Sequence, residues 1–405
     1  MRLLFIHEVN WLRKVTFEIH ELPELLSVRG HEVDFIDFPE EERRTGLARF
    51  LDLRTRVTTV QSRTVPGSRI GLHTPGRVFP PPFDRLFATV TFVPLLIRLL
   101  RRRNYDAIVL YGVPTNGWQT AVVARLFRIP VLYRGIDVAH ALRKTRLAKL
   151  IELSERYIYR NVTQLSVNNV ALREYCISNG AAPQSVSVDY PGLDIEHFRE
   201  SAGVEELRES LGIRPEERVV VYMGTFFRFS GLDHVLRGLA EHRLKNQAIR
   251  LVLIGGGEQR IALERLVDEL SLRTNVVFTG FVDYVNLPRY LAAADVAITP
   301  FQPQLVSHKA LPWKVVQYVA SGVPVVSTKL EGLMGLCPEG HGVLYIDNLE
   351  SIWETVEVLL ADNDKARTVV ESGLKVVEEN CSWNEQILKF EQAIEDLALG
   401  RGRIG

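Results

Sequence analysis

The stretch "LVLIGGGEQRIALERLVDEL", residues Leu251–Leu270, joins a short aliphatic run, three consecutive glycines and a helical pattern. Apolar residues recur at the i, i+3, i+4, i+7 spacing of a helix with one buried face: Leu263, Leu266, Val267 and Leu270. The order predicts a strand, a tight turn and a helix. A helix N-terminus after such a turn offers unpaired N–H groups to a phosphate. Because Arg260 stands where the dinucleotide-binding fingerprint needs a third glycine, a plain tight turn is the alternative.

Aliphatic strands alternate with helical patterns along nearly the whole chain, which predicts an α/β fold with parallel sheets. The expected strands of the first half are Arg2–Ile6, Glu32–Asp37, Ala107–Tyr111, Val131–Arg134, Gln164–Val167 and Ser185–Val188. Those of the second half are Arg218–Met223, Arg250–Ile254, Asn275–Thr279, Val296–Thr299, Pro324–Ser327 and Gly342–Tyr345. We therefore expect two similar doubly wound domains, whose ligands bind at the carboxyl ends of the strands.

Length and composition limit the class of protein. The chain has 405 residues, enough for two domains with a core each. Lys plus Arg and Asp plus Glu number 49 each, so the overall charge gives no indication of a nucleic-acid partner. Three widely spaced cysteines, Cys176, Cys337 and Cys381, fit reduced, buried thiols in a cytoplasmic enzyme and exclude a disulfide framework or a zinc cluster.

Membrane segments are not indicated at either candidate place. The start, "MRLLFIHEVNW", predicts a buried strand rather than a signal peptide, because its apolar run stops at His7 and Glu8. The segment Phe87–Arg103 is interrupted by Pro94 and Arg98 and ends in three arginines, so it lacks the roughly 20 apolar residues of a span. A basic, apolar helix of this kind fits a peripheral contact with the inner face of a membrane. A core helix with a solvated basic end is the alternative.

We expect the domain boundary near Phe198, in a segment with many turn signals. This gives an N-terminal domain over residues 1–198, a C-terminal domain over 199–382 and a final amphipathic helix over 383–405 that must pack on one of them. Residues Pro39–Pro82 are rich in Arg, Gly and Pro, and they predict a long, partly mobile insertion on one face.

Two segments of the second half carry candidate ligand contacts. "VVVYMGTFFRFSGLDHVLRGLAE" predicts a strand, a loop with Gly224 and Thr225, and a helix that opens near Gly231, with Arg228 as a nearby cation. In "FTGFVDYVNLPRYLAAADVAITPFQ", Phe281 follows a strand end whose free backbone edge can pair with a nucleobase. A loop glycine and a solvated arginine are the bland alternative.

The segment "QLVSHKALPWKVVQYVASGVPVVST", residues Gln304–Thr328, is the densest in polar groups. We expect a loop before a helix that begins near Leu311, and this loop suits an anion such as a sugar diphosphate. Its candidate contacts are Ser307, His308, Lys309, Lys314 and Gln317, the last two on one helix face by the i, i+3 rule. A capped surface helix is the alternative.

The three second-half segments "LVLIGGGEQRIALERLVDEL", "NVVFTGFVDYVNLPRYLAAADVAITPF" and "KVVQYVASGVPVVST" resemble, in order and spacing, the donor-binding domain of retaining glycosyltransferases of the GT-B fold, family 4. In the first half, "SVNNVALREYCISNGAAPQSVSVDYPGLDIEHF" resembles a signature of that family, with Pro191 where asparagine is usual. "LLSVRGHEVDFIDF" resembles its first helix and second strand. The match runs from Arg2 to about Ala398, apart from Pro39–Pro82.

The resemblance implies two Rossmann-like domains facing a central cleft, with the last helix crossing back to the N-terminal domain. It implies transfer of a sugar from a nucleoside diphosphate sugar with retention at the anomeric carbon, with no cofactor besides this co-substrate and no required metal. The donor lies mostly on the C-terminal domain and the acceptor on the N-terminal one. On this reading the three glycines, with Gly256 at their centre, form a tight turn on the nucleotide side.

The sequence departs from the family pattern at charged positions. Ser230 stands at the usual lysine position, so Arg228 alone remains as the cation of that loop. The family's two glutamates fall at Lys309 and Gln317; Gln317 can still accept from a ribose hydroxyl, and Lys309 can balance the diphosphate. Since positive charge assists departure of the diphosphate, removal of Arg228, Lys309 or Lys314 is expected to slow transfer by roughly 100-fold or more.

In the N-terminal domain the resemblance directs attention to "VLYRGIDVAH", where the family often has a histidine and an aspartate near the reacting carbon. Arg134 and Asp137 occupy this loop; Asp137 can stabilise a cationic transition state or orient an acceptor hydroxyl. An N-cap for the next helix is its alternative role. His7, Glu8 and Asn10 after the first strand are further candidate acceptor contacts. The candidate catalytic residues are thus Asp137, Arg228 and Lys309.

The sequence predicts a cytoplasmic glycosyltransferase that builds a surface polysaccharide or glycolipid on a glycan or lipid-linked acceptor. Two alternatives belong to other classes. The missing acidic pair and lysine fit a partner subunit without transferase activity. A GT-B enzyme of other chemistry, such as a nucleotide-sugar epimerase or a phosphorylase, would act without an acceptor or would require inorganic phosphate.

Overall fold

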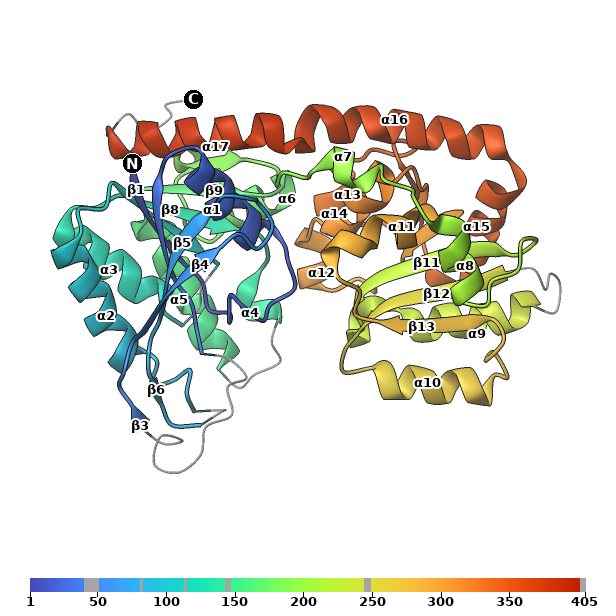
Figure 1. The fold of residues 1–405 in the computed structure, drawn as a ribbon, viewed down its shortest axis with the longest axis horizontal. Coiled ribbons are helices and arrows are strands. Elements are labelled where there is room, and N and C mark those ends of the chain that lie inside the picture. Colours follow the sequence, from blue (N-terminus) through green and yellow to red (C-terminus); the bar gives the residue numbers. More distant parts are fainter. Residues whose placement is uncertain (40–50, 81–82, 113–114, 143–146, 244–248, 401–405) are drawn as a thin grey trace. The chain divides into compact units, whose positions relative to one another are not determined.

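The computed structural model describes residues 1–39, 51–80, 83–112, 115–142, 147–243 and 249–400. The chain divides into two compact units, Met1–Gly192 with Asn384–Gly405, and Leu193–Trp383. Each unit has its own sheet with helices packed on it (Figure 1). The boundary expected near Phe198 falls at Gly192 in this division.

The first unit is built on an eight-stranded sheet in the order β10-β9-β8-β7-β1-β2-β5-β4. All neighbouring strands are parallel except β4, which runs antiparallel to β5. The strands are β1 (Arg2–Ile6), β2 (Glu32–Ile36), β4 (Arg56–Gln61), β5 (Arg69–Thr74), β7 (Ala107–Tyr111), β8 (Val131–Gly135), β9 (Gln164–Val167) and β10 (Val186–Val188). The central strands are apolar without alternation because helices cover both of their faces.

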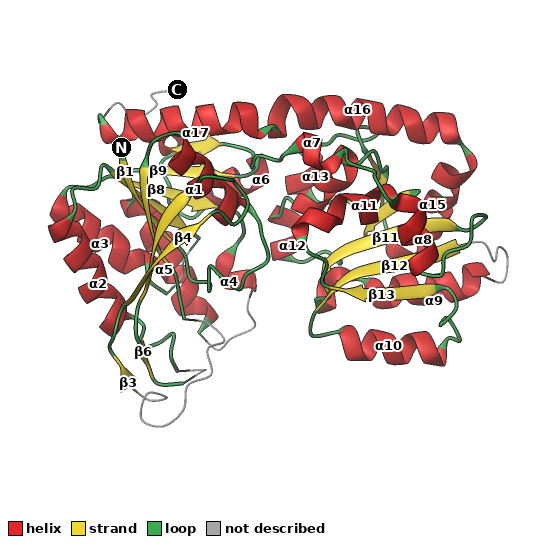
Figure 2. Ribbon diagram, in the orientation of Figure 1, coloured by secondary structure: helices red, strands yellow, loops and turns green. Residues whose placement is uncertain are grey.

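Helices α2, α3 and α5 lie together on this unit (Figure 2). The helices of the unit are α1 (Glu18–Val28), α2 (Thr89–Arg102), α3 (Gly117–Phe127), α4 (Ala139–Leu142), α5 (Ala148–Asn161), α6 (Val170–Ser178) and most of α17 (Trp383–Ala398). Every second strand residue, such as Leu4, Ile6, Ile108 and Leu110, joins one core with the inner face of α2. This packing leaves the opposite face of α2 in solvent.

The prediction of an irregular insertion over Pro39–Pro82 is wrong for residues 51–80, which contain four strands. β4 and β5 come from this segment and extend the main sheet beside β2, and β3 (Leu51–Asp52) pairs with β6 (Arg77–Val78) in a separate ribbon. The sequence pattern did not predict these strands, because β4 is an exposed edge strand without an apolar face, as is common at sheet edges. Residues 40–50 and 81–82 of the predicted insertion lie outside the described part of the chain.

The second unit has a six-stranded, fully parallel sheet in the order β13-β12-β11-β14-β15-β16. Its strands are β11 (Arg218–Thr225), β12 (Ile249–Gly256), β13 (Val276–Gly280), β14 (Val296–Thr299), β15 (Val325–Thr328) and β16 (Val343–Ile346). Its helices are α7 (Ile195–Phe198), α8 (Val204–Ser210), α9 (Leu232–Arg243), α10 (Arg260–Glu269), α11 (Leu287–Ala292), α12 (Leu305–Lys309), α13 (Trp313–Ala320), α14 (Glu331–Met334), α15 (Ile352–Ala361) and α16 (Asn363–Cys381). Strand, turn and helix over Leu251–Leu270 are as the sequence predicts.

The C-terminal helix α17 belongs to the first unit through a cluster of charges. Glu391 on α17 accepts from the guanidinium of Arg29 at 2.5 Å and contacts His31 Nε2 at 2.6 Å. These contacts lower the pKa of Glu391. All three cysteines are buried, and none of them forms a disulfide. Within the described residues, no helix has the length and apolar character needed to cross a membrane.

Candidate functional site

The sheet of the second unit changes its winding direction between β11 and β14. From β11 the chain continues to β12 and β13 on one side, and it then builds β14, β15 and β16 on the other. Open parallel sheets bind ligands at such a switch point, outside the carboxyl ends of the strands. Here these ends are Gly224 and Thr225 in β11 and Thr299 in β14. They define the candidate donor site.

Lys314, in the first turn of α13, brings a positive charge to this switch point. Its Nζ lies 4.0 Å from the ring centre of Tyr222 in β11 and 4.7 Å from that of Phe301, which follows β14. It has no carboxylate partner within the described part of the chain. Desolvation lowers the pKa of the ammonium to about 7. A cation held only by aromatic rings lacks a counter-charge, which an anionic ligand can supply.

Gly224 is required beside this lysine for two reasons. Its φ of +132° lies in a region that side chains rarely adopt. A Cβ at this position would lie 2.9 Å from Lys314 Nζ. Glycine therefore leaves both the strand end and the ammonium open to a ligand.

The loop after β11 holds Ser230 where the family pattern has a lysine. The Oγ of Ser230 is buried, lies 3.0 Å from the Tyr222 hydroxyl and accepts the N–H of Phe227. Tyr222 thus contacts both Ser230 and Lys314. Position 230 thus lacks the lysine of the family pattern, and Lys314 on α13 brings a positive charge to the same tyrosine, Tyr222.

Arg228 is the second cation of the candidate donor site. Its side chain is exposed, and no partner of its guanidinium is found within the described residues. Its backbone N–H donates to Glu258 at 3.2 Å, and the rings of Phe227 and Phe229 stack beside it. The loop is therefore fixed while the guanidinium remains available to an anion.

The three glycines of the opening stretch allow two strand ends to approach each other. A Cβ at Gly255 would lie 2.2 Å from the carbonyl oxygen of Gly224, and one at Gly257 would lie 2.8 Å from the backbone nitrogen of Phe226. Both have positive φ, 121° and 152°. The close approach predicted for this turn is therefore to the backbone at the end of β11.

Gly256 and Phe281 lie together at the edge of the sheet. A Cβ at Gly256, the last residue of β12, would lie 3.2 Å from the Phe281 ring, which is 68% exposed and follows the edge strand β13. An exposed aromatic ring beside a free strand edge suits the flat face of a nucleobase.

The structure changes the interpretation of the segment before α13. Ser307, His308 and Lys309 form part of a separate short helix, α12, rather than a loop. Ser307 Oγ is buried and bonds to the backbone of Gln302 and Gln304, so it caps this helix and is not free for a donor. The ammonium of Lys309 pairs with Glu331, so the prediction that it balances a diphosphate loses its basis.

Two other residues of this segment have side-chain polar atoms without a hydrogen-bond partner among the described residues. The Nδ1 of His308 is buried and has no hydrogen-bond partner among the described residues. The Gln317 side chain, partly buried on α13 one turn after Lys314, also has no partner within the described residues. Both stay predicted donor contacts.

In the first unit, Glu8 fills the corresponding switch point between β1 and β7. Its carboxylate is buried and accepts the N–H groups of Thr115 and Asn116, at 2.6 and 2.7 Å, before α3. Arg85 contacts it at 3.1 Å. Glu8 therefore holds a helix start, which corrects its predicted acceptor contact. Among its predicted companions, the His7 ring lies 5.7 Å from that of Tyr111, and Asn10 accepts the N–H of Arg13.

Arg134 is also part of the framework and not an acceptor contact. Its side chain is 2% exposed and makes two bonds of 2.7 Å to the two oxygens of Glu18. It also donates to Ser166 and to the carbonyl of Asp189. Burial of the guanidinium demands these partners, and they leave it no exposed donor for a substrate.

Asp137 differs from these residues because its carboxylate has no partner in the described chain. It follows β8 and is partly buried. Desolvation raises the pKa of its carboxyl to about 7. It does not cap α4, because the N–H of Ala139 donates to Glu155 instead. An unpaired carboxyl with a shifted pKa at a strand end is a candidate acid or base.

Sequence reasoning missed the partner of the neighbouring His140. Its Nδ1 lies 2.7 Å from the buried carboxylate of Glu155 and 3.4 Å from the Tyr175 hydroxyl. Such a contact fixes the orientation of the imidazole ring. No local pattern could reveal the pair, because Glu155 comes from α5.

Comparison with protein families now decides the class. The family described as "Glycosyl transferases group 1" matches residues 203–376, and "Glycosyl transferase 4-like domain" matches residues 16–192. The chain belongs to the group 1 glycosyltransferases of family 4 type. The two matches together cover most of both units.

Individual relatives are distant. An uncharacterized glycosyltransferase of Methanocaldococcus jannaschii is 28% identical over 56% of this chain and 58% of its own length. A D-inositol 3-phosphate glycosyltransferase of Mycobacterium ulcerans is 26% identical over 72% of this glycosyltransferase and 66% of its own length. The matched region thus spans less than two thirds of each relative.

Solved structures identify the fold as GT-B. Sucrose-phosphate synthase of Thermosynechococcus elongatus has a TM-score of 0.77 at 18% identity, over 98% of this chain and 99% of that one. HepE of Anabaena in complex with UDP has a TM-score of 0.74 at 15% identity, over 98% of this chain and 100% of that one. The expected fold of two Rossmann-like, parallel sheets is confirmed.

Proposed function

We propose that this glycosyltransferase moves a sugar from a nucleoside diphosphate sugar to a glycan or lipid-linked acceptor, with retention at the anomeric carbon, in the synthesis of a surface polysaccharide or glycolipid. The observation that carries the proposal is the unpaired, desolvated ammonium of Lys314 at the switch point of the second sheet. It lies where an α/β sheet binds its ligand, and this partly buried charge has no carboxylate partner among the described residues.

In the proposed reaction, the bond between the anomeric carbon and the diphosphate oxygen breaks. A new bond forms to the acceptor oxygen on the same face, and the acceptor proton passes to the departing diphosphate. Lys314 and Arg228 stabilise the negative charge that develops on the leaving group. Gln317 accepts from a ribose hydroxyl, and Phe281 supports the base. Because two cations serve the diphosphate, we propose that no divalent metal is needed, so a chelator should leave the rate unchanged.

The first test is thermal stabilisation of the purified protein by a panel of nucleoside diphosphates. UDP leads the panel because HepE was solved with UDP and with UDP-glucose. A diphosphate at about 100 times its dissociation constant should add roughly 2.7 kcal/mol to the free energy of unfolding. Arg228→Ala and Gln317→Ala should weaken this effect, whereas Arg237→Ala, an exposed change on α9, should not.

A panel in which no diphosphate stabilises the protein would contradict the donor site. That result would favour a partner subunit without transferase activity, which the missing acidic pair already suggests.

Asp137 provides a prediction on pH. Since its pKa is about 7, kcat/KM should rise with pH up to about 7 if the carboxylate form acts on the acceptor or on the sugar cation. Asp137→Asn should remove this rising limb and lower the maximum by about 100-fold. The measurement is kcat/KM against pH for both proteins, with His140→Gln as the control for the nearby imidazole. A rising limb that persists in Asp137→Asn would assign the titration to another group.

A further inference from the structure

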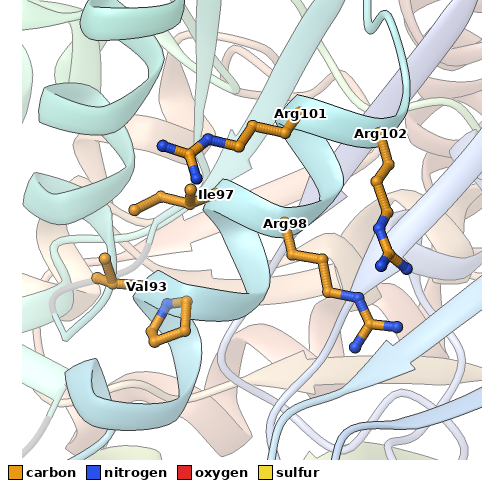
Figure 3. A pocket seen from close by; sticks show the side chains of 6 residues that line it. Val93, Ile97, Arg98, Arg101 and Arg102 are labelled. Carbon is orange, nitrogen blue, oxygen red and sulfur yellow. The ribbon is translucent and has the colours of Figure 1, made fainter.

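The outer face of α2 combines exposed apolar and basic side chains. Its inner residues pack into the core of the first unit. Its outer residues follow one stripe along the helix, in which Val93 and Ile97 are partly buried against that core. Val93, Pro94, Ile97, Arg98, Arg101 and Arg102 line a surface groove of about 510 Å³ (Figure 3). We name this stripe, with the preceding Phe83, Leu86, Phe87 and Val90, the α2 surface.

The basic half of the α2 surface carries three charges without counter-ions. Arg98, Arg101 and Arg102 are exposed and have no partner in the described part of the chain. Figure 3 shows Arg98 and Arg102 pointing to one side of the helix, while Arg101 extends beside Ile97. Arg103 next to them instead pairs with the buried Asp34 at 2.6 Å. Helix Thr89–Arg102 has no acidic residue, so its outer face has a single sign of charge.

The apolar half comprises Val90 in the first turn of α2 and the turns that precede the helix. Phe83 and Val90 are 56% and 51% exposed, and Leu86 and Phe87 are exposed as well. The ring of Phe87 lies 4.7 Å from that of Phe79. Phe79 has a φ of +66°, which is rare for a bulky residue. A strained turn that exposes aromatic rings is costly unless another surface covers them.

We propose that the α2 surface docks this protein on a lipid bilayer that contains anionic phospholipid. Apolar side chains enter the boundary between headgroups and acyl chains, and the adjacent arginines bind lipid phosphates. Charge complementarity selects this occupant, since three guanidinium groups without a partner among the described residues border the groove, and helix Thr89–Arg102 has no acidic residue. This docking does not depend on sugar transfer, but it would place the enzyme close to a lipid-linked acceptor.

The test is co-sedimentation of the full chain with vesicles, without any donor. We expect binding to vesicles of phosphatidylglycerol and phosphatidylcholine, weak binding to phosphatidylcholine alone, and loss of binding in high salt, which screens the arginines. Each arginine near an anionic surface contributes about fivefold, so Arg98→Gln/Arg101→Gln/Arg102→Gln should bind roughly 100-fold more weakly. Phe87→Ser/Val90→Ser should lose about tenfold through the apolar term.

A matched control removes three charges from the second unit: Arg237→Gln/Arg265→Gln/Lys375→Gln. These side chains are exposed and unpaired within the described residues, and the variant should bind vesicles as the unaltered protein does. The melting temperature of the α2 triple variant and its stabilisation by nucleoside diphosphate should stay unchanged. A failure of the membrane proposal can therefore be distinguished from a failure of the proposed donor site. Equal binding to neutral and anionic vesicles, or equal losses in both triple variants, would overturn the proposal.

Discussion

Lys314→Met is expected to lower the rate of sugar transfer by at least about 100-fold and to abolish stabilisation by nucleoside diphosphate. Methionine keeps the length and the apolar stem of the side chain, so the contacts with Tyr222 and Phe301 can persist while the charge is lost. The ammonium is the charge that the departing diphosphate would meet. Removal of this charge should therefore weaken the stabilisation of the leaving group without destabilising the fold.

Stability separates this loss of function from misfolding. The pKa of Lys314 is lowered from 10.5 to about 7, so between these values the unfolded chain binds a proton that the folded protein does not. The free energy of unfolding therefore rises as the pH increases from about 7 toward 10.5, and below 7 the folded protein bears the full cost of the desolvated charge. Lys314→Met removes this cost. Its melting temperature at pH 6 should equal or exceed that of the unaltered protein.

The same titration affects donor binding. A diphosphate favours the ammonium form, so affinity should fall as the pH rises above about 7, by up to tenfold per unit. The measurement is the dissociation constant of the stabilising diphosphate at several pH values. Lys314→Met should bind weakly with no such dependence.

Lys309→Met is the control within the same segment. Lys309 pairs with the exposed Glu331 on the protein surface, so its loss should change the rate and the stability little. If Lys309→Met were as damaging as Lys314→Met, the charge of the donor site would lie at α12, as the sequence alone predicts. If Lys314→Met still bound diphosphate, the switch point would not be the donor site.

The sequence could predict both sheets apart from β4 and β5, because parallel strands covered on both faces are continuously apolar, as β7 and β11 are. It could not rank Lys309 against Lys314. Both are lysines near one helix start, and only their surroundings differ. Lys309 pairs with the carboxylate of Glu331, 22 residues later. Lys314 lies against two aromatic rings, those of Tyr222 and Phe301, which come from separate strands or their ends. Local pattern cannot encode such neighbours.

The same limit explains Arg134. Position at the end of a strand made it a candidate substrate contact, but its partner Glu18 lies 116 residues earlier in sequence. Asp137, three residues later on the same loop, has no partner in the described chain and stays a candidate. Pairing across the fold therefore distinguishes a framework charge from a functional one.

Arg134→Met is expected to lower the free energy of unfolding of the first unit by about 3–5 kcal/mol, because it leaves the buried Glu18 carboxylate without its cation. The Tyr111 hydroxyl, which donates to Glu18 at 3.0 Å, is the remaining partner shown and carries no positive charge. The measurement is urea unfolding of both proteins. Arg367→Met, which breaks the exposed pair with Asp364 on α16, should cost less than about 1 kcal/mol.

A double variant distinguishes a framework role from a substrate contact. Glu18→Gln/Arg134→Met removes both charges, so it should regain much of the lost stability, as buried pairs replaced together commonly do. Diphosphate binding should survive in Arg134→Met and in the double variant as in the unaltered protein, because the donor residues belong to the second unit. If Arg134→Met instead unfolded like the unaltered protein while KM for the acceptor rose, the ion pair would be dispensable and Arg134 would contact the acceptor after all.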